Sequence, residues 1–256
     1  MKIKSEPLIK MVNIKKNFGN IEALKGVDFE VYPDEIVGLV GDNGAGKSTL
    51  MRILSGIYPP TEGEIYFQAK KISFSSPRDS RMLGIEAVHQ GFGLTELMSI
   101  SKNIFLGAEP VKKFGPLKFL DLDKMEKETI SVLEKVGIKR MKPNYIINGL
   151  SGGQRQSIKI ARAVYFKAKM IILDEPHMAL SVRERDKIWD MIMELKQRKV
   201  SAVYISHDIG IVYNLADKFV ILDAGTKIGE FKKGEVSLED LTNIIREGKN
   251  VISNKL

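Results

Sequence analysis

The stretch from residue 41 to residue 49 reads GDNGAGKST and has the spacing of a phosphate-binding loop. Its glycines allow the backbone to wrap closely around phosphate oxygens, with several N–H groups pointing inward. The start of a following helix would add its positive end. Lys47 would bring a full charge to the β- and γ-phosphates, and the Ser48 hydroxyl would bind Mg²⁺. The predicted ligands are Gly41, Asn43, Gly44, Ala45, Gly46, Lys47, Ser48 and Thr49.

Two adjacent carboxylates, Asp174 and Glu175, follow an apolar run and precede Pro176. Successive side chains of an extended strand point to opposite faces, so Asp174 is predicted to face Mg²⁺ while Glu175 turns toward the γ-phosphate. A carboxylate in that position can orient or deprotonate an attacking water. Such a pair alone is usually a solvated strand end, and the phosphate-binding loop upstream favours the catalytic interpretation.

Short apolar runs that alternate with helical patterns would position these residues. The runs at 36–40, 170–174, 202–206 and 219–222 are typical of buried strands, and the segments 47–54, 182–198 and 209–216 are typical of helices. This alternation predicts an α/β fold with a mainly parallel central sheet. The first 35 residues and residues 64–67 favour antiparallel strands at one side.

From about residue 91 to 166 the pattern becomes mostly helical, most clearly from Asp123 to Val136. We interpret this segment as a helical lobe inserted into the α/β core. The whole chain, 1–256, would then be a single domain, with its core made of about 1–90 and 167–256.

Composition limits the class of protein. Cysteine is absent, which excludes disulfides and thiolate metal sites and fits a reducing cytoplasm. No apolar run approaches the roughly 18 residues that cross a bilayer, and the N-terminus lacks the apolar core of a secretory signal. We therefore predict a soluble protein that reaches a membrane only through a partner. The net charge of +8 is assigned mainly to solvated lysine-rich helices, and no aromatic-and-basic stripe indicates a nucleic-acid partner.

Residues 150–156, LSGGQRQ, narrow the choice among phosphate-loop proteins. They resemble the LSGGQ signature of ATP-binding-cassette (ABC) ATPases. The alternative is an ordinary helix start capped by Ser151, but a cap does not need two glycines followed by glutamine. Backbone N–H groups at Gly152 and Gly153, with the Ser151 hydroxyl, can grip a γ-phosphate. The resemblance implies that these residues and Gln154 face the ATP of a second subunit, in a head-to-tail homodimer that encloses two ATP molecules.

Other positions match the family pattern one by one. Gln90 resembles the glutamine that touches Mg²⁺ and relays contact to the transporter. His207 resembles the histidine near the γ-phosphate, and Phe18 lies where the family has an aromatic ring that stacks on adenine. The resemblance implies a P-loop NTPase core that binds ATP and Mg²⁺. It assigns Mg²⁺ to Ser48, Gln90 and Asp174, and ATP hydrolysis to Lys47, Glu175 and His207.

Within the family, the chain is most similar to ATPases of ribose, xylose and fructose importers, through stretches at 105–107, 122–125, 160–164 and 217–222. This resemblance implies a monosaccharide importer with permease subunits and a separate solute-binding protein, the ATPase lying on the cytoplasmic face of the cell membrane. An importer of a nucleoside or amino acid is an alternative. A cassette ATPase acting on ribosomes or DNA would need a charged linker or a long coiled coil, which the chain lacks. A regulatory module without turnover is disfavoured by the intact carboxylates and histidine.

The chain departs from the family pattern after Pro176. His177 replaces the usual threonine, and Ser181 stands where aspartate is common. A histidine beside a phosphate could titrate near neutral pH. We interpret His177 as a neutral packing substitution and expect His177→Thr to retain substantial ATPase activity.

Overall fold

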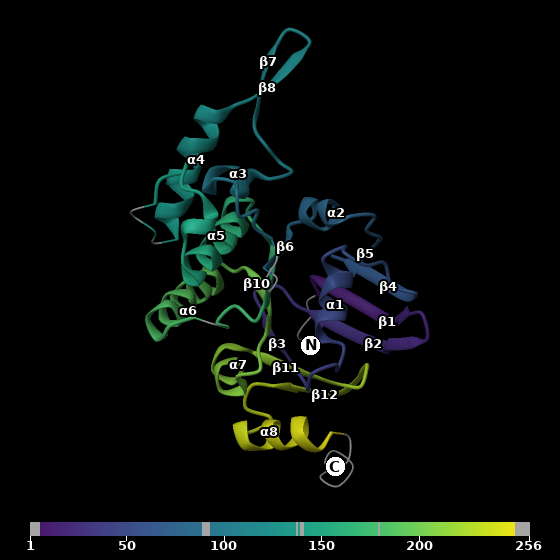
Figure 1. Ribbon diagram of the computed structural model, residues 1–256. Helices are drawn as coiled ribbons and strands as arrows, with labels where there is room; N and C mark the ends of the chain where they lie inside the picture. The colour runs from purple at the N-terminus through teal and green to yellow at the C-terminus, as the bar shows by residue number, and fades with distance from the viewer. Residues whose placement is uncertain (1–5, 89–92, 137, 139–140, 179, 249–256) are drawn as a thin grey trace. The chain divides into compact units, whose positions relative to one another are not determined.

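The computed structural model describes residues 6–88, 93–136, 138, 141–178 and 180–248. The strands are β1 (Ile9–Phe18), β2 (Ile21–Val31), β3 (Ile36–Val40), β4 (Glu62–Phe67), β5 (Lys70–Ile72), β6 (Ile85–Val88), β7 (Val111–Phe114), β8 (Leu117–Leu120), β9 (Met170–Asp174), β10 (Ser201–Ile205), β11 (Lys218–Asp223) and β12 (Thr226–Lys232). The helices are α1 (Lys47–Leu54), α2 (Pro77–Met82), α3 (Ile100–Phe105), α4 (Leu122–Lys135), α5 (Gly152–Tyr165), α6 (Val182–Gln197), α7 (Ile209–Leu215) and α8 (Leu238–Glu247), with a short 3₁₀ turn at Ile147–Gly149. Figure 1 labels these elements.

The chain divides into two compact units. The first comprises the described residues up to 87, residues 169–175 and the described residues from 196 onward. The second comprises residues 88–168 and 176–195, apart from the few positions that the structure does not describe. Among the described residues, no helix is both long enough and apolar enough to span a bilayer.

The first unit is built on a six-stranded sheet in the order β12-β11-β3-β10-β9-β6. Strands β11, β3, β10 and β9 are parallel, and β12 runs antiparallel to β11. Every residue of β3, β9 and β10 is buried, as expected for parallel strands that are covered on both faces. Because Asp174 pairs with Ile205 at the ends of β9 and β10, the residues that follow both strands emerge at one edge of the sheet.

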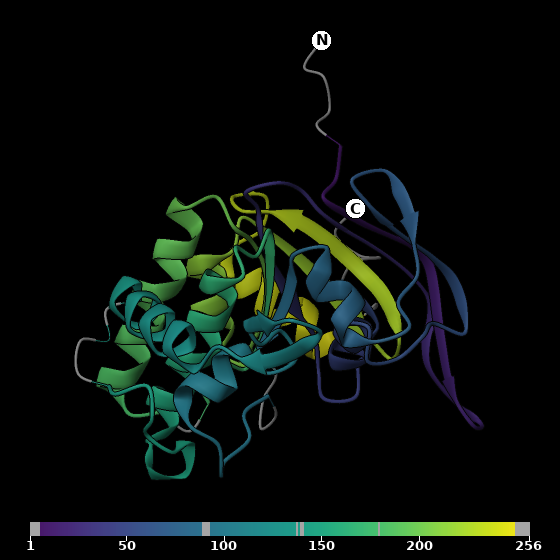
Figure 2. The same ribbon diagram turned by 90° about the horizontal axis from the view of Figure 1, so that it is seen from above.

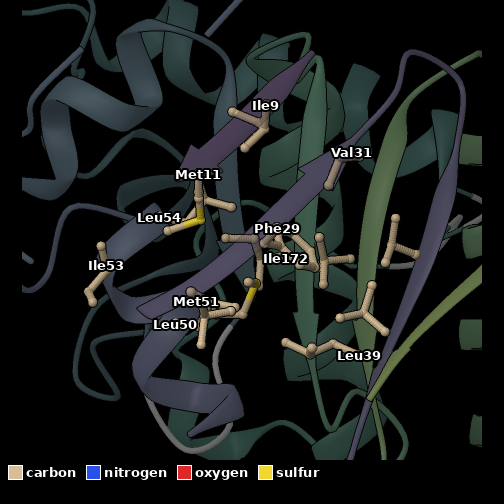
Figure 3. Close-up of a cluster of buried hydrophobic side chains, with 14 of the residues drawn as sticks. Ile9, Met11, Phe29, Val31, Leu39, Leu50, Met51, Ile53, Leu54 and Ile172 are labelled. Atoms are coloured by element: carbon tan, nitrogen blue, oxygen red, sulfur yellow. The ribbon is translucent and has the colours of Figure 1, made fainter. Parts of the chain in front are cut away.

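A four-stranded sheet in the order β2-β1-β4-β5 forms the antiparallel part of the first unit. The hydrophobic core between this sheet and the central sheet includes α1 (Figure 3). Met11 and Phe29 come from the antiparallel sheet, Leu50 and Met51 from α1, and Ile172 from β9. All five side chains are fully buried. The core thus fixes the helix at whose start Lys47 lies.

The second unit is mainly helical, and its helices group together in the teal and green segments of Figure 2. Helices α3, α4 and α5 contact one another pairwise. Asp121 caps α4 by accepting a hydrogen bond from the Lys124 N–H, and Ser151 caps α5. The hairpin of β7 and β8 belongs to this unit and turns at Gly115, where φ is +61°.

The α/β class, the mainly parallel sheet and the antiparallel strands are confirmed. The bounds of β3, α1 and β9 are those predicted, and the other predicted strands and helices differ by one or two residues at their ends. The β7–β8 hairpin lies inside the stretch that the sequence predicts as mostly helical. The second unit also contains residues 176–195, which the sequence analysis assigned to the core.

Candidate functional site

The loop from Gly41 to Gly46 connects β3 to α1 and requires glycine at both of these positions. Gly41 has φ +143°, and a Cβ there would overlap the backbone carbonyl of Leu222. Gly46 has φ +100°, and a Cβ there would lie 2.7 Å from the Leu24 side chain and 2.9 Å from the Ala23 carbonyl oxygen. An L-residue would be strained and would clash at either position, so the sequence specifies this tight loop.

The Lys47 side chain folds back onto the loop that precedes it. Its side chain is 7% exposed, and its Nζ donates hydrogen bonds to the carbonyl oxygens of Gly41 at 2.7 Å and Asp42 at 2.8 Å. Burial lowers the Lys47 pKa, while the charges of Glu175, Asp42 and Asp174 oppose that shift. An ammonium group has three N–H donors, so one remains beyond the two loop carbonyls.

The start of α1 carries no side-chain cap, because its N-cap residue is Gly46. Asn43 and Gly44 are exposed, Ala45 is buried, and Ser48 and Thr49 are partly buried in the first turn. A buried ammonium beside an uncapped helix start is an arrangement that fits phosphate oxygens. The residues present therefore suit the phosphates of a nucleotide.

Asp174 is the last residue of β9 and is 6% exposed. Burial raises its pKa, and the neighbouring Arg52, Lys47 and His207 oppose the rise. Within the described residues, no three His, Cys, Asp or Glu side chains gather into a metal cluster. Ser48 and Asp174 offer hard oxygen ligands of the kind Mg²⁺ takes when phosphates and waters complete its shell. Gln90, the third predicted ligand, lies outside the described residues.

Glu175 follows β9 with φ +51°, in the left-handed region. The alternation of an extended strand therefore ends at Asp174 and does not set the direction of the Glu175 side chain, although the sequence-based prediction relied on it. The turned backbone is held by a hydrogen bond from the Glu175 N–H to the Ile205 carbonyl oxygen at 3.0 Å. A non-glycine residue in this region is strained, and such strain clusters at functional sites.

The Glu175 carboxylate meets the residues that follow β10. Ser206 Oγ donates to Glu175 Oε2 at 3.2 Å, and His207 Nε2 lies 3.6 Å from Glu175 Oε1. Burial raises the Glu175 pKa, and His207 and the Ser206 hydrogen bond oppose the rise. The structure thus brings two predicted catalytic side chains together. Ser206 was not predicted, and its signal was a small hydroxyl residue at the end of a buried strand next to the predicted histidine.

Phe18 ends β1 and is 41% exposed. Its ring packs edge-to-face on Tyr58, with centroids 5.3 Å apart, and the Lys16 Nζ lies 5.3 Å from its centroid. The Phe18 ring is therefore held in place while part of its surface stays accessible. Tyr58 was not identified from the sequence.

In the second unit, residues 151–154 form the start of α5. The Gln154 N–H donates to Ser151 Oγ at 3.2 Å, and the Ser151 N–H donates to Gln154 Oε1 at 2.9 Å. This reciprocal capping box uses the Gln154 side chain for the helix itself. Gly152 is exposed and Gly153 is buried. His177, also in this unit, is buried.

Glu184 of α6 joins this group, and sequence reasoning missed it. Ser151 Oγ donates to Glu184 Oε1 at 2.7 Å, and the Gly153 N–H donates to the same oxygen at 3.3 Å. These contacts, with others from Ser181, hold the pKa of Glu184 at about 2. The pattern Ser181-x-x-Glu184 is a capping-box signal that could have drawn attention to it.

Residues 24–178 match the family model described as ABC transporter. The chain is 42% identical to the xylose/arabinose import ATP-binding protein of Sulfolobus acidocaldarius, covering 93% of each. It is 37% identical to the fructose import ATP-binding protein of Rhizobium meliloti, covering 92% of each. A ribose import ATP-binding protein of Caldanaerobacter subterraneus is 35% identical, and the alignment covers 94% of this chain and 48% of that protein.

Two solved structures resemble the fold. A nucleotide-free ATP-binding cassette from an ABC transporter has a TM-score of 0.78 and 26% identity, with 96% of this chain and 98% of that chain covered. A dimeric post-hydrolysis state of an ATP-binding cassette bound to ADP and Pi has a TM-score of 0.74 and 27% identity, with 88% and 98% covered.

Proposed function

Because this chain belongs to the ABC transporter family, we propose that it is the ATP-hydrolysing subunit of a monosaccharide importer. The observation that carries the proposal is the Glu175 carboxylate, which is partly buried beside Ser206 and His207 and interacts electrostatically with Lys47. The relatives are named as import ATP-binding proteins for xylose and arabinose, for fructose or for ribose. Their names support a monosaccharide as the imported solute.

The first unit would hold the nucleotide. The N–H groups of residues 41–49 and the third N–H of Lys47 would contact the β- and γ-phosphates, and Phe18 would stack on the base. Ser48, Gln90 and Asp174 would hold Mg²⁺, which neutralises phosphate charge when bound. The buried ammonium of Lys47 would stabilise the charge that develops on the γ-phosphate, at a place where water is largely excluded.

Glu175 would orient the attacking water and accept its proton. Its raised pKa makes the carboxylate a better base than an exposed glutamate, because the ideal catalytic pKa lies near the working pH. Ser206 fixes one carboxylate oxygen, which leaves the other facing His207. His207 would help hold the transferring phosphate in line with the water.

The second unit would supply Ser151, Gly152 and Gly153 to the ATP of another copy of the chain. A solved relative that is dimeric with ADP and Pi supports a homodimer of this kind. Closing and opening of the dimer would drive permease subunits, to which a solute-binding protein delivers the sugar. The chain would act on the cytoplasmic face of the membrane.

The test compares ATP turnover of the wild type and Glu175→Gln with Mg²⁺ present. We expect the substitution to lower kcat at least about 100-fold, the range of general-base catalysis, while ATP binding is retained. Glu239→Gln, which changes an exposed carboxylate in the first turn of α8, is the matched control and should keep wild-type turnover. Parental turnover by Glu175→Gln would show that Glu175 does not position the water.

The solute class needs a separate test in vesicles that contain the permease. ATP-dependent uptake of a pentose or hexose in the presence of this chain supports the proposal. Uptake of an amino acid or nucleoside without any sugar uptake would assign the importer to the alternative class.

A further inference from the structure

The Glu184 carboxylate accepts hydrogen bonds from residues at the starts of two helices in the second unit. Its Oε1 accepts hydrogen bonds from Ser151 Oγ at 2.7 Å and from the Gly153 N–H at 3.3 Å, both at the start of α5. Its Oε2 accepts from the Ser181 N–H at 3.1 Å and Oγ at 2.9 Å, just before α6. Oε1 therefore accepts hydrogen bonds at the start of α5, and Oε2 accepts them at the start of α6.

The Oε1 contacts use the donors that would bind a phosphate. Ser151 has one hydroxyl proton and Gly153 has one N–H, and both are directed to Glu184. A phosphate oxygen cannot accept a hydrogen bond from the Ser151 hydroxyl while that hydroxyl donates to Glu184. Two anions at one helix start would also repel each other.

Gly153 has no side chain, and this leaves room for the Glu184 carboxylate. A Cβ at Gly153 would lie 2.7 Å from both Cγ and Oε1 of Glu184 and 2.8 Å from its Cβ. No side chain fits between the start of α5 and Glu184. The backbone of α5 therefore approaches an anion as closely as glycine allows.

We propose that Glu184 occupies the Ser151 hydroxyl and the Gly153 N–H within its own subunit, and that it must release these two donors before the partner's ATP can bind there. The proposal rests on the proposed function, because it describes the regulation of the same site. Glu184 acts as an internal competitor whose displacement is part of dimer closure.

The geometry allows this release. Oε2 keeps the carboxylate on Ser181, so only the Oε1 contacts need to break. A cavity of about 680 Å³ adjoins the site and is lined by Ser151, Gly153 and Glu184, together with Lys187 and Asp190 of α6. Lys187 follows Glu184 by three residues on the helix, where its ammonium can donate a hydrogen bond to Oε1 once that oxygen leaves Ser151 and Gly153.

The first test follows inorganic phosphate binding through the Gly153 amide resonance in the isolated chain. It needs neither hydrolysis nor dimerisation. We expect Glu184→Gln to reach half-saturation at about tenfold less phosphate than the wild type, because the competing bonds lose their charge. Asp190→Asn removes one negative charge from the same helix and cavity and should titrate like the wild type. Equal or weaker binding by Glu184→Gln would overturn the proposal and make Glu184 a positioning residue for Ser151.

The second test measures ATP-dependent dimerisation by analytical ultracentrifugation in Glu175→Gln, with and without Glu184→Gln. We expect the double variant to form half of its dimer at about tenfold lower ATP. If it needs the same or more ATP, the competitor role is wrong while the dimer stands. If Glu175→Gln remains monomeric although the phosphate result holds, the dimer of the proposed function fails and the assignment of Glu184 survives.

Discussion

Replacing Lys47 with methionine tests two roles of this side chain, the observed clamp on the loop and the proposed contact with phosphate. Its Nζ donates to the Gly41 and Asp42 carbonyl oxygens, and its remaining N–H would meet the nucleotide phosphates. Methionine has a similar length and fills the same space without the charge. The substitution therefore removes the ligand to phosphate and the clamp on the loop together.

The two effects differ in size. A charge-assisted hydrogen bond to phosphate contributes about 1.5–3 kcal/mol, and its loss weakens ATP binding about ten- to a hundredfold. The free energy of unfolding should change by less than about 1 kcal/mol, because two lost hydrogen bonds are offset by relief from burying an ammonium group. Burial of Lys47 disfavours its charged form and lowers its pKa.

Titration calorimetry with a non-hydrolysable ATP analogue and Mg²⁺ measures the first effect, and urea unfolding without nucleotide measures the second. Lys70→Met changes an exposed lysine of β5 to the same residue and should leave both quantities at wild-type values. Binding within about threefold of wild type would refute the role of Lys47 in contacting phosphate. A loss of more than about 2 kcal/mol in stability would show that the affinity change comes from collapse of the loop.

Two further predictions concern the first unit. Burial raises the pKa of Glu86 to about 7 from 4.5, so the free energy of unfolding should fall as pH rises from about 4.5 to above 7, by at most about 3 kcal/mol. Glu86→Gln should therefore stabilise the protein by about 2 kcal/mol at pH 8 and change little at pH 4, and urea unfolding at the two pH values checks this. Gly38→Ala should destabilise by about 1–3 kcal/mol, because its Cβ would overlap Val212 of α7 and lie 3.1 Å from the Ala216 Cβ. Gly149→Ala, where a Cβ meets nothing within 4 Å, is its control, and equal melting temperatures for the two variants would contradict the packing argument.

The sequence alone determined the phosphate-binding loop and the elements beside it. The five buried residues of β3, the glycines of the loop and Lys47 are adjacent in the chain, and their conformations depend mostly on local sterics. The continuous apolar runs of β3 and β9 likewise predict buried parallel strands, because both faces of those strands must be apolar. Local patterns of this kind can be read without knowledge of the partners across the fold.

The sequence predicted less well where a short element lies inside a stretch of another type. The β7–β8 hairpin lies within a stretch that is otherwise mostly helical. Each of its strands has only four residues, which is too few to show a clear strand pattern among helical ones. The turn at Gly115-Pro116 was the signal that could have shown it. The placement of residues 176–195 in the second unit depends on packing between segments distant in sequence, which periodicity does not report.

Only the tertiary structure decided how the charged groups meet. Glu175 turns toward Ser206 and His207 because its backbone leaves the strand and bonds to Ile205, 30 residues away in the chain. Glu184 reaches Ser151 because the starts of α5 and α6 converge, although 33 residues separate the two. Such contacts depend on how far strands and helices extend and on how they pack. Residue type and spacing can therefore identify candidate functional side chains, but they cannot show which of these side chains share a hydrogen bond.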